Sequence, residues 1–401
     1  MKDHPPPASA PSPFAALMTV TNRPDTVFTR GEGSWLWDDT GRRHLDVVQG
    51  WAVNTLGHAP PVIAEALRAQ ADRVLHIGPG FHNDQAIALA NRLVALSGLD
   101  RCFFTNSGAE ANEGAIKLAR KYGRIHRDGA HEIITFTNSF HGRTLATMSA
   151  SGKPGFDTLF APQVPGFPKA RLNDLASVEA LVGPGTVAVM LEPIQGEAGV
   201  VEATPAFLQG LRVLCDRHGL LLMFDEVQTG VGRTGDWWGH TAPGVRPDVM
   251  TLGKGLGGGV PIGALLAREA VCCFAPGDQG GTYNGNALVC AVASAVLGAV
   301  AAPGFLANVH ARGQQLREGL DRIGTRLGSG PVRGRGLLLA LDLPGTGQAP
   351  HVAEVLRTRP GVGVLVNAVQ PQRLRFVPAL NVSEDEVAML LDALGEALPG
   401  A

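Results

Sequence analysis

The stretch that decides the fold is "VMTLGKGLGGGVP", residues 249–261, which places one lysine among five glycines directly after a short apolar run. Gly253, Gly255 and Gly258 match the G-x-G-x-x-G spacing of a dinucleotide-binding turn, but that spacing has meaning only between a strand and the helix that receives the pyrophosphate. The following "VPIGALLA" is β-branched and apolar without a helical stripe, so it predicts a strand. A P-loop is disfavoured too, because Gly255 follows the lysine where a hydroxyl should hold magnesium. The role of the lysine must come from the rest of the chain.

Composition narrows the choice of partners. The 401 residues are 45% hydrophobic, enough for two domains or one large domain with an appendage. Thirty-four basic and 36 acidic residues give a formal charge of −2, which predicts small-molecule ligands rather than nucleic acid or a membrane surface. Five cysteines without CxxC or metal-ligand spacing predict reduced thiols, a cytoplasmic location and no metal site. The Pro-, Ala- and Ser-rich start, residues 1–13, predicts a disordered leader.

Hydrophobic periodicity predicts two folded units. Residues 26–48 alternate apolar and polar side chains around turn signals, which indicates a small antiparallel meander within an N-terminal segment, 14–60, that packs with the small domain. Short apolar runs then alternate with helix-length segments, which predicts an α/β domain over 61–302 with a mostly parallel sheet sandwiched by helices. Its apolar stretch 287–302 is too short to span a bilayer and predicts a buried helix. Over residues 303–401 the order of expected helices and strands no longer alternates regularly, which predicts a smaller α+β domain.

Four stretches end apolar runs where the ligand of a parallel sheet would lie. In "TNSGAE" a strand gives way to a helix near Ala109, which suits an anion, although a plain helix cap explains the same residues. Asp225 and Glu226 end a very apolar strand and need a partner there, which could be a cofactor cation, a divalent metal or Arg233. The other two are Lys254 among its glycines and the aromatic "SFHGRT".

Together these parts match what pyridoxal phosphate requires. A lysine can form a Schiff base with the aldehyde, and a buried carboxylate can keep the pyridinium nitrogen protonated so that the ring accepts electrons. An aromatic side chain can stack on the ring, and a helix N-terminus can hold the phosphate. The residues therefore favour Lys254 as a nucleophile over a nucleotide-binding loop.

The chain resembles the class III pyridoxal-phosphate aminotransferases, and among them the acetylornithine aminotransferases, from about residue 27 to 397. The resemblance implies the type I fold of these enzymes and a cytoplasmic homodimer with shared active sites. The matching segments, in chain order, are "GEGSWLWDDTGRRHLD", "AVNTLGH", "FFTNSGAEANEGAIKLAR", "SFHGRTLATMSAS", "LEPIQGEAGV", "FDEVQTGVGRTG", "TLGKGLGGGVPIGA", "GGTYNGNAL" and "LRFVPALNVSEDE".

The resemblance also implies roles for cofactor-binding residues. Lys254 is expected to be the Schiff-base lysine and Asp225 the partner of the ring nitrogen, with both acting in catalysis. The remaining expected contacts are the phosphate cradle of Ser107, Gly108 and Ala109, the stacking pair Phe140 and Val227, Gln228 at the phenolic oxygen, and Thr282 reaching the phosphate from the other subunit.

For the substrate, the resemblance implies that Arg143 grips the carboxylate far from the reacting carbon. Glu197 and Arg375 are expected to be joined at rest and parted when a dicarboxylate binds, and Gly281 is expected to contact substrate. The expected reaction moves the terminal amine of N2-acetylornithine to 2-oxoglutarate. Ornithine, succinylornithine and 4-aminobutyrate stay open as donors, because one or two pocket side chains shift such preferences.

Small departures accompany the resemblance. Ala109 stands where a hydroxyl residue is common, Ala198 follows Glu197 where glycine is usual, and "GNAL" replaces "GNPL". They bear on phosphate affinity and substrate preference without removing a catalytic group. A nicotinamide-dependent oxidoreductase and a non-catalytic binding module are the competing classes; the first lacks an acidic residue about 20 positions beyond a strand-to-helix turn, and the second would require a lost catalytic position.

Overall fold

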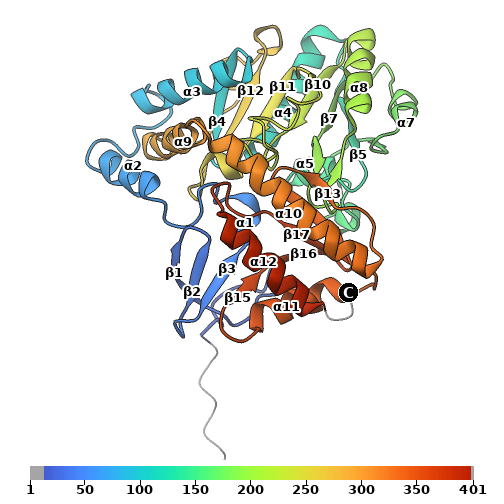
Figure 1. Cartoon of the computed structure of the whole chain (residues 1–401). Helices are drawn as coiled ribbons and strands as arrows, with labels where there is room; N and C mark the ends of the chain where they lie inside the picture. Colours follow the sequence, from blue (N-terminus) through green and yellow to red (C-terminus); the bar gives the residue numbers. More distant parts are fainter. Residues whose placement is uncertain (1–12, 399–401) are drawn as a thin grey trace, which may run out of the picture.

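The computed structural model describes residues 13–398, so the predicted leader lies, except for its last residue, outside the described residues. A seven-stranded sheet forms the larger layer (Figure 1), in the order β4-β12-β11-β10-β7-β5-β6. β12 runs antiparallel to both of its neighbours, whereas the other pairs are parallel, as the prediction of a mostly parallel sheet requires. The strands are β4 (Arg101–Thr105), β5 (Glu132–Phe136), β6 (Lys169–Ala170), β7 (Thr186–Leu191), β10 (Leu221–Asp225), β11 (Val249–Leu252) and β12 (Gly263–Ala267).

Helices cover both faces of this sheet. In β10, Leu221 and Met223 pack into the same core as helix α4, while the alternate residues Leu222 and Phe224 pack into the core that contains α8. This alternation is the period-2 geometry of a strand buried on both faces. The helices before the small domain are α1 (Gln49–Ala52), α2 (Pro61–Ala71), α3 (Asp84–Ser97), α4 (Gly108–His126), α5 (Leu145–Ala150), α6 (Phe156–Leu159), α7 (Leu175–Glu179), α8 (Pro205–His218) and α9 (Ala287–Val300), with 3₁₀ turns at Lys254–Leu256 and Glu269–Val271.

The C-terminal part builds a second core around a four-stranded antiparallel sheet, in the order β13-β14-β17-β16. Helices α10 and α12 lie side by side in Figure 1, and their apolar faces share one core with this sheet. Ser383 caps α12 in a capping box, and acidic residues in the first turn suit the positive end of the helix dipole. The elements are β13 (Arg333–Arg335), β14 (Leu338–Asp342), β16 (Asn367–Gln370), β17 (Arg373–Phe376), α10 (Phe305–Leu327), α11 (Gln348–Thr358) and α12 (Glu384–Ala397).

The N-terminal meander is joined by a strand from the other end of the chain. Strands β1 (Phe28–Glu32), β2 (Trp35–Asp38) and β3 (Arg43–Asp46) are antiparallel, and β15 (Gly363–Leu365) adds to β3 in parallel. The sequence predicts β15 as part of the small α+β domain, but the structure pairs it with β3 instead of the small sheet. The chain changes sheets between β15 and β16, which periodicity over so few residues cannot reveal. A further hairpin pairs β8 (Ile194–Gln195) with β9 (Val201–Glu202).

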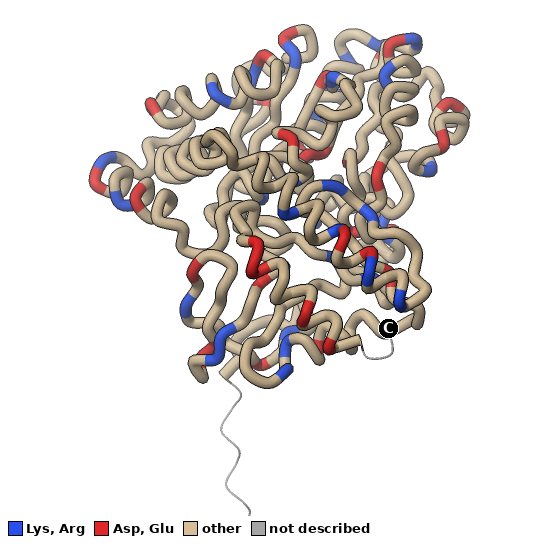
Figure 2. Tube along the Cα trace, in the orientation of Figure 1, with Lys and Arg blue, Asp and Glu red and all other residues tan. Residues whose placement is uncertain are grey.

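Charges of both signs are interspersed along the trace in Figure 2. The Ala- and Val-rich stretch predicted as a buried helix forms α9, whose buried residues include Cys290, Val292 and Val296. Within residues 13–398 no single helix has the length and apolarity to cross a membrane; α9 and α10 would pass that test only as a pair, and they meet at a bend of 70°.

Arg233 links the loop after β10 to the small sheet, and within residues 13–398 it has no acidic partner. Its buried Nη1 donates to Leu337 O at 3.0 Å and to Pro378 O at 2.6 Å, both on segments flanking the small sheet. It is therefore not the counter-charge of Asp225 or Glu226 that the sequence left open. Burial lowers the pKa of Arg233 to about 9, and the carbonyls supply the hydrogen bonds that a buried guanidinium needs.

We expect Arg233→Met to lower the free energy of unfolding by about 2 kcal/mol, because two buried carbonyls lose a charged donor. Chemical denaturation monitored by circular dichroism measures this change. Arg217→Met is the matched control, since Arg217 forms an exposed pair with Glu179, and we expect a change of at most about 0.5 kcal/mol. Equal denaturation midpoints for Arg233→Met and the control would contradict the role of Arg233.

Candidate active site

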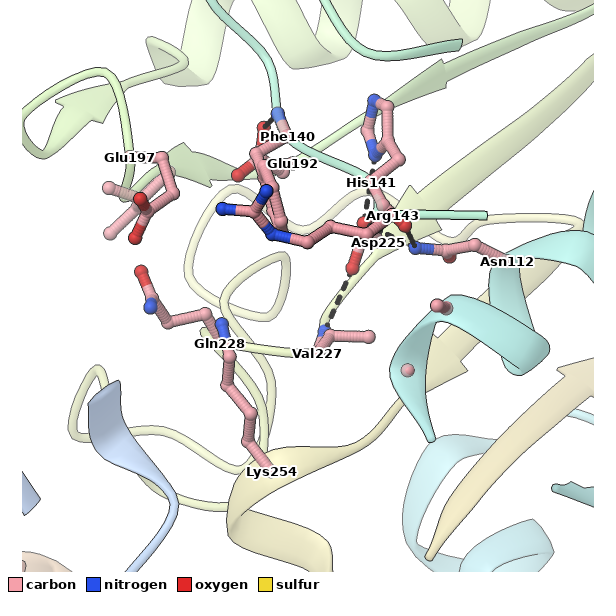
Figure 3. Close-up of a pocket in the computed structure, with 14 residues that line it drawn as sticks. Asn112, Phe140, His141, Arg143, Glu192, Glu197, Asp225, Val227, Gln228 and Lys254 are labelled. Atoms are coloured by element: carbon pink, nitrogen blue, oxygen red, sulfur yellow. Dashed lines mark hydrogen bonds and ion pairs between the residues drawn. The ribbon is translucent and has the colours of Figure 1, made fainter. Parts of the chain in front are cut away.

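A cavity of about 260 Å³ opens at the carboxyl ends of the large-sheet strands (Figure 3). This is the edge at which ligands bind in open α/β sheets. The cavity brings together segments separated by more than one hundred residues. It is lined by Gly108, Ala109, Asn112, Phe140, His141, Gly142, Arg143, Glu192, Ile194, Glu197, Asp225, Val227, Gln228 and Lys254.

Asp225 is buried at the end of β10 and accepts three hydrogen bonds. His141 Nδ1 and Asn112 Nδ2 each donate to Oδ2 at 2.8 Å, and Val227 N donates to Oδ1 at 3.0 Å. Because a carboxylate only accepts, His141 must carry its proton on Nδ1. Three donors from three segments thus stabilise a negative charge beneath the cavity.

Asn112 is itself held in one orientation. Thr251 Oγ1 donates to Asn112 Oδ1 at 2.6 Å, which leaves the amide group of Asn112 to donate to Asp225 and to His141 O. All of these side chains are buried. The chain Thr251–Asn112–Asp225 therefore links β11, α4 and β10 through groups whose donor and acceptor roles are all defined.

Glu226, the next residue, faces a different environment. It accepts from Gly239 N at 2.8 Å and from His240 N and His240 Nδ1 at 2.9 and 2.7 Å, and it also bonds Thr229 Oγ1. Burial by itself would raise the pKa of Glu226, but the hydrogen bond from His240 and the other contacts lower it. The two neighbouring acids therefore have separate partners and do not converge on a shared cation site.

Phe140 and Val227 line the cavity on different sides of Asp225 (Figure 3), and we call the space between them the slot. Val227 forms one wall, and it packs so closely that a Cβ added to Gly108 would lie 2.6 Å from Val227 Cγ1. Phe140 lies on the other side, where its backbone N donates to Glu192 Oε2 at 3.0 Å. Burial and, secondarily, the charge of Asp225 raise the pKa of Glu192 well above its ordinary value. The slot suits a flat aromatic ring.

Lys254 follows β11 in a strained backbone conformation. Its φ of 40° lies in the left-handed region, which is uncommon for a residue with a side chain and is found at functional sites. Burial lowers the pKa of the Lys254 amine, the charge of Arg375 lowers it further, and the nearby carboxylates oppose both effects. The net direction favours the neutral amine, which is the nucleophilic form.

The N-terminus of α4 points its free N–H groups toward the same cavity, where Gly108 and Ala109 line the wall. Ser107 caps the helix by accepting from Glu110 N at 3.2 Å, so the plain cap considered in the sequence is present. Its hydroxyl proton is still available to donate. A nineteen-residue helix beginning here provides an anion-binding end to the slot.

Two cavity-lining side chains have buried polar atoms without a partner in the described part of the chain: both amide atoms of Gln228, and Nε2 of His141. Arg375, which contacts the lining residue Glu197, has Nε and Nη2 unpartnered as well. Arg375 uses Nη1 to reach Glu197 Oε1 at 2.8 Å. Burial would raise the pKa of Glu197, but the charge and hydrogen bond of Arg375 outweigh it and lower the pKa. Since unsatisfied buried polar atoms are costly, these groups are suited to polar ligand atoms.

Nine of the thirteen predicted site residues line the cavity, and two more adjoin it, since Ser107 precedes Gly108 and Arg375 bonds Glu197. The other two lie elsewhere. Thr282 is exposed, and Gly281 lines a separate cavity with Phe81 and Asn284. Arg143 is exposed at the mouth of the site, with its guanidinium carbon 5.8 Å from the Phe156 ring centroid.

The sequence does not predict five of the cavity residues, which are Asn112, His141, Gly142, Glu192 and Ile194. Each lies inside a stretch that was singled out, one or a few positions from a predicted residue. A buried carboxylate at Asp225 requires donors, and His141 beside Phe140 was the nearest signal for one. Nothing in the spacing of Asn112 or Glu192 indicates that they reach the site.

The site can hold a flat ring with an anionic arm. The slot accepts the ring, Asp225 lies where a cationic ring nitrogen would be stabilised, and Gln228 has free amide atoms for a ring oxygen. The α4 N-terminus accepts a phosphate, and Lys254 presents an amine. Pyridoxal phosphate meets each of these requirements.

Comparisons with known proteins agree with this geometry. Residues 18–398 match the model of the aminotransferase class-III family. The chain is 59% identical over 379 residues to acetylornithine aminotransferase 2 of Bordetella bronchiseptica, covering 94% of this chain and 96% of that protein. It is 48% identical to a succinylornithine transaminase of Salmonella typhimurium, with 90% of each chain covered.

Solved structures give the same result. The ornithine aminotransferase from Toxoplasma gondii superposes with a TM-score of 0.90 at 31% identity, covering 95% of this chain and 92% of that one. The type I fold predicted from the resemblance is confirmed, and an oxidoreductase built on the glycine-rich stretch is excluded. The chain belongs to the class III aminotransferases and is a pyridoxal-phosphate-dependent transaminase.

Proposed function

We propose that this transaminase moves the terminal amino group of N2-acetylornithine to 2-oxoglutarate, giving N-acetylglutamate 5-semialdehyde and glutamate, a step of arginine biosynthesis. The observation that carries the proposal is the pairing of buried Arg375 with Glu197 beside Lys254. This pairing masks a carboxylate-binding group that only one of the two substrates needs. The similarity to an acetylornithine aminotransferase supports the choice of donor.

When bound, pyridoxal phosphate supplies an aldehyde for the substrate amine and an electron-accepting ring that stabilises negative charge at the adjacent carbon. Asp225 holds a negative charge for the ring nitrogen, and His141 and Asn112 keep that charge in place. Phe140 and Val227 would clamp the ring, while Ser107, Gly108 and Ala109 would hold the phosphate end. Lys254 contributes the amine and, when neutral, accepts the proton that leaves the substrate.

Arg143 and Arg375 divide the work of substrate binding. The donor brings its amine to the site and its single carboxylate to Arg143, so it needs nothing from Arg375. With Glu197 bound to Arg375, the apolar methylenes of the donor meet a neutralised pair. 2-Oxoglutarate has a carboxylate beside its keto carbon, and the two unpartnered nitrogens of Arg375 can bind that group in a fork. Because two carboxylates on one guanidinium repel each other, Glu197 then moves away.

We also propose a homodimer in which Thr282 and Gly281 of one subunit complete the site of the other. Thr282 is exposed and lies outside this subunit's cavity, next to the exposed Tyr283. Large exposed apolar side chains are typical of surfaces that bury against a partner. Thr282 would then supply its hydroxyl to the phosphate across the interface.

A succinylated donor is the second candidate, because a succinylornithine transaminase is 48% identical to this chain. Ornithine and 4-aminobutyrate are further alternatives within the family. The test mixes the purified holoenzyme in turn with N-acetylornithine, succinylornithine, ornithine and 4-aminobutyrate and follows the visible absorbance of the cofactor in single turnovers. A larger rate constant over dissociation constant for any other donor than for N-acetylornithine would overturn the proposed substrate.

We expect Lys254→Ala to fold and still bind pyridoxal phosphate, but to lose covalent attachment and about a thousandfold or more of turnover. Borohydride reduction followed by intact-protein mass spectrometry detects the attachment. Lys121→Ala is the control, because Lys121 pairs with Asp278 outside the cavity. A mass increase in reduced Lys254→Ala equal to that of the wild type would reject Lys254 as the attachment residue.

We expect Asp225→Asn to weaken cofactor affinity about 10- to 100-fold, since a charge-assisted hydrogen bond contributes roughly 1.5–3 kcal/mol. Glu226→Gln should do less to affinity and instead lower thermal stability, because Glu226 binds only protein groups. Cofactor titration by fluorescence and thermal melts of the cofactor-free protein separate the two effects. The reverse pattern would exchange the roles of the two acids.

We expect Arg375→Ala to slow amination of 2-oxoglutarate about 100-fold or more while leaving the donor half-reaction within a few-fold, because a bidentate contact to a carboxylate is lost only there. Arg143→Ala should impair both halves. Glu197→Gln should improve α-amino donors such as glutamate, since Arg375 is unmasked. Single-turnover absorbance traces with donor and with keto acid measure each half, and equal losses in Arg375→Ala would contradict the switch.

A further inference from the structure

Glu197 lies between two cations, of which the proposed switch uses only one. Its Oε1 accepts from Arg375 Nη1 at 2.8 Å, while its Oε2 lies 3.8 Å from Lys153 Nζ. The Arg375 side chain is fully buried, whereas that of Lys153 is 37% exposed. The first contact is a hydrogen-bonded ion pair and the second is an ion pair too long for a hydrogen bond.

Lys153 lies beside aromatic rings, one of which belongs to the cavity-lining residue Phe140. Its Nζ lies 5.7 Å from the ring centroids of both Phe140 and Phe156. Cations are attracted to ring faces at this range, so the rings keep Lys153 near Glu197, which is its one carboxylate partner in the described part of the chain. Its position just beyond α5 places it on a different segment from Arg375.

Release of Glu197 from Arg375 creates an electrostatic problem. A carboxylate that is largely withdrawn from water is destabilised when it loses its partner. After burial, which raises the pKa of Glu197, the charges of Arg375, Lys254 and Lys153 all lower it. Once a substrate carboxylate neutralises Arg375, Lys153 is the remaining cation of residues 13–398 that lies within 4.0 Å of Glu197, so it can keep Glu197 ionised.

We propose that Lys153 is a positioning residue that receives the Glu197 carboxylate when a dicarboxylic substrate takes over Arg375. The inference rests on the proposed function, because it requires that Glu197 leaves Arg375 in one half-reaction. In the donor half-reaction Glu197 stays bound to Arg375, so Lys153 does not take part in substrate binding. In the 2-oxoglutarate half-reaction a short rotation of the Glu197 side chain closes the 3.8 Å gap.

The test measures the apparent dissociation constant of 2-oxoglutarate in single turnovers of the amine form of the enzyme. We expect Lys153→Met to raise this constant roughly fivefold, the effect of a partly exposed ion pair, and to change the donor half-reaction by less than about twofold. Lys153→Arg should restore 2-oxoglutarate binding. Arg171→Met is the control for loss of an exposed cation, since Arg171 pairs with Asp174 away from the cavity.

A double-mutant cycle identifies the route of the effect. In a Glu197→Gln background, Lys153→Met should add no further loss, because no carboxylate remains to be received. An acceptor without a carboxylate beside its reacting carbon, such as succinic semialdehyde, should bind equally to wild type and Lys153→Met. Additive losses in the double variant, or equal losses with both acceptors, would overturn the proposal and assign Lys153 to the distal end of the substrate.

The two proposals fail in different ways. If the proposed function is wrong about the acceptor, wild-type enzyme fails to turn over with 2-oxoglutarate. If only the role of Lys153 is wrong, wild type turns over and Lys153→Met binds 2-oxoglutarate as tightly as wild type. Thermal melts of Lys153→Met show whether the variant is still folded. The Lys153→Arg variant keeps the positive charge, so it shows whether the charge at this position is what 2-oxoglutarate binding requires.

Discussion

The buried negative charge of Asp225 is the constraint on which the site depends. A carboxylate at the end of an apolar strand is tolerated only if donors surround it, and the donors come from α4, from the segment after β5 and from the turn after β10. Satisfying one charge therefore fixes the relative position of three segments. The cavity walls, the helix N-terminus and Lys254 follow from that arrangement.

Around this centre, the two sheets supply different parts of the chemistry. The carboxyl ends of the large sheet provide Asp225 and Lys254, whereas the small sheet contributes Arg375 from β17. Arg375 is fully buried, so its selectivity depends on which anion reaches it rather than on its own motion. Glu197, on the hairpin after β7, is the partly exposed member of the pair and the one able to move. In the proposed switch, Glu197 is therefore the group that exercises substrate choice.

The sequence predicts those parts of the fold and the site in which a single position has its own steric or electrostatic requirement. An apolar run ending in Asp225, a lysine among glycines and a small polar turn before α4 each imply a strand end with a function. Asn112 and Glu192 were not predictable, because their roles depend on partners far along the chain. The same limit applies to β15, whose three residues pair with β3 across more than three hundred positions. Thr282 is exposed and lies outside the cavity of its own subunit, so its proposed role depends on a second subunit.

The Val227 wall has a mechanical consequence. Val227 is backed by the main chain of Gly108 and Gly253, where an added Cβ would lie 2.6 and 3.2 Å from its side chain, so this wall cannot recede. Phe140 on the other side is tethered through one backbone hydrogen bond to Glu192. Any tolerance for a thicker or tilted ring must therefore come from one side only. One side of the slot is therefore fixed and the other is adjustable. Substitutions that change the width of the slot are expected to be tolerated around Phe140 but not around Val227.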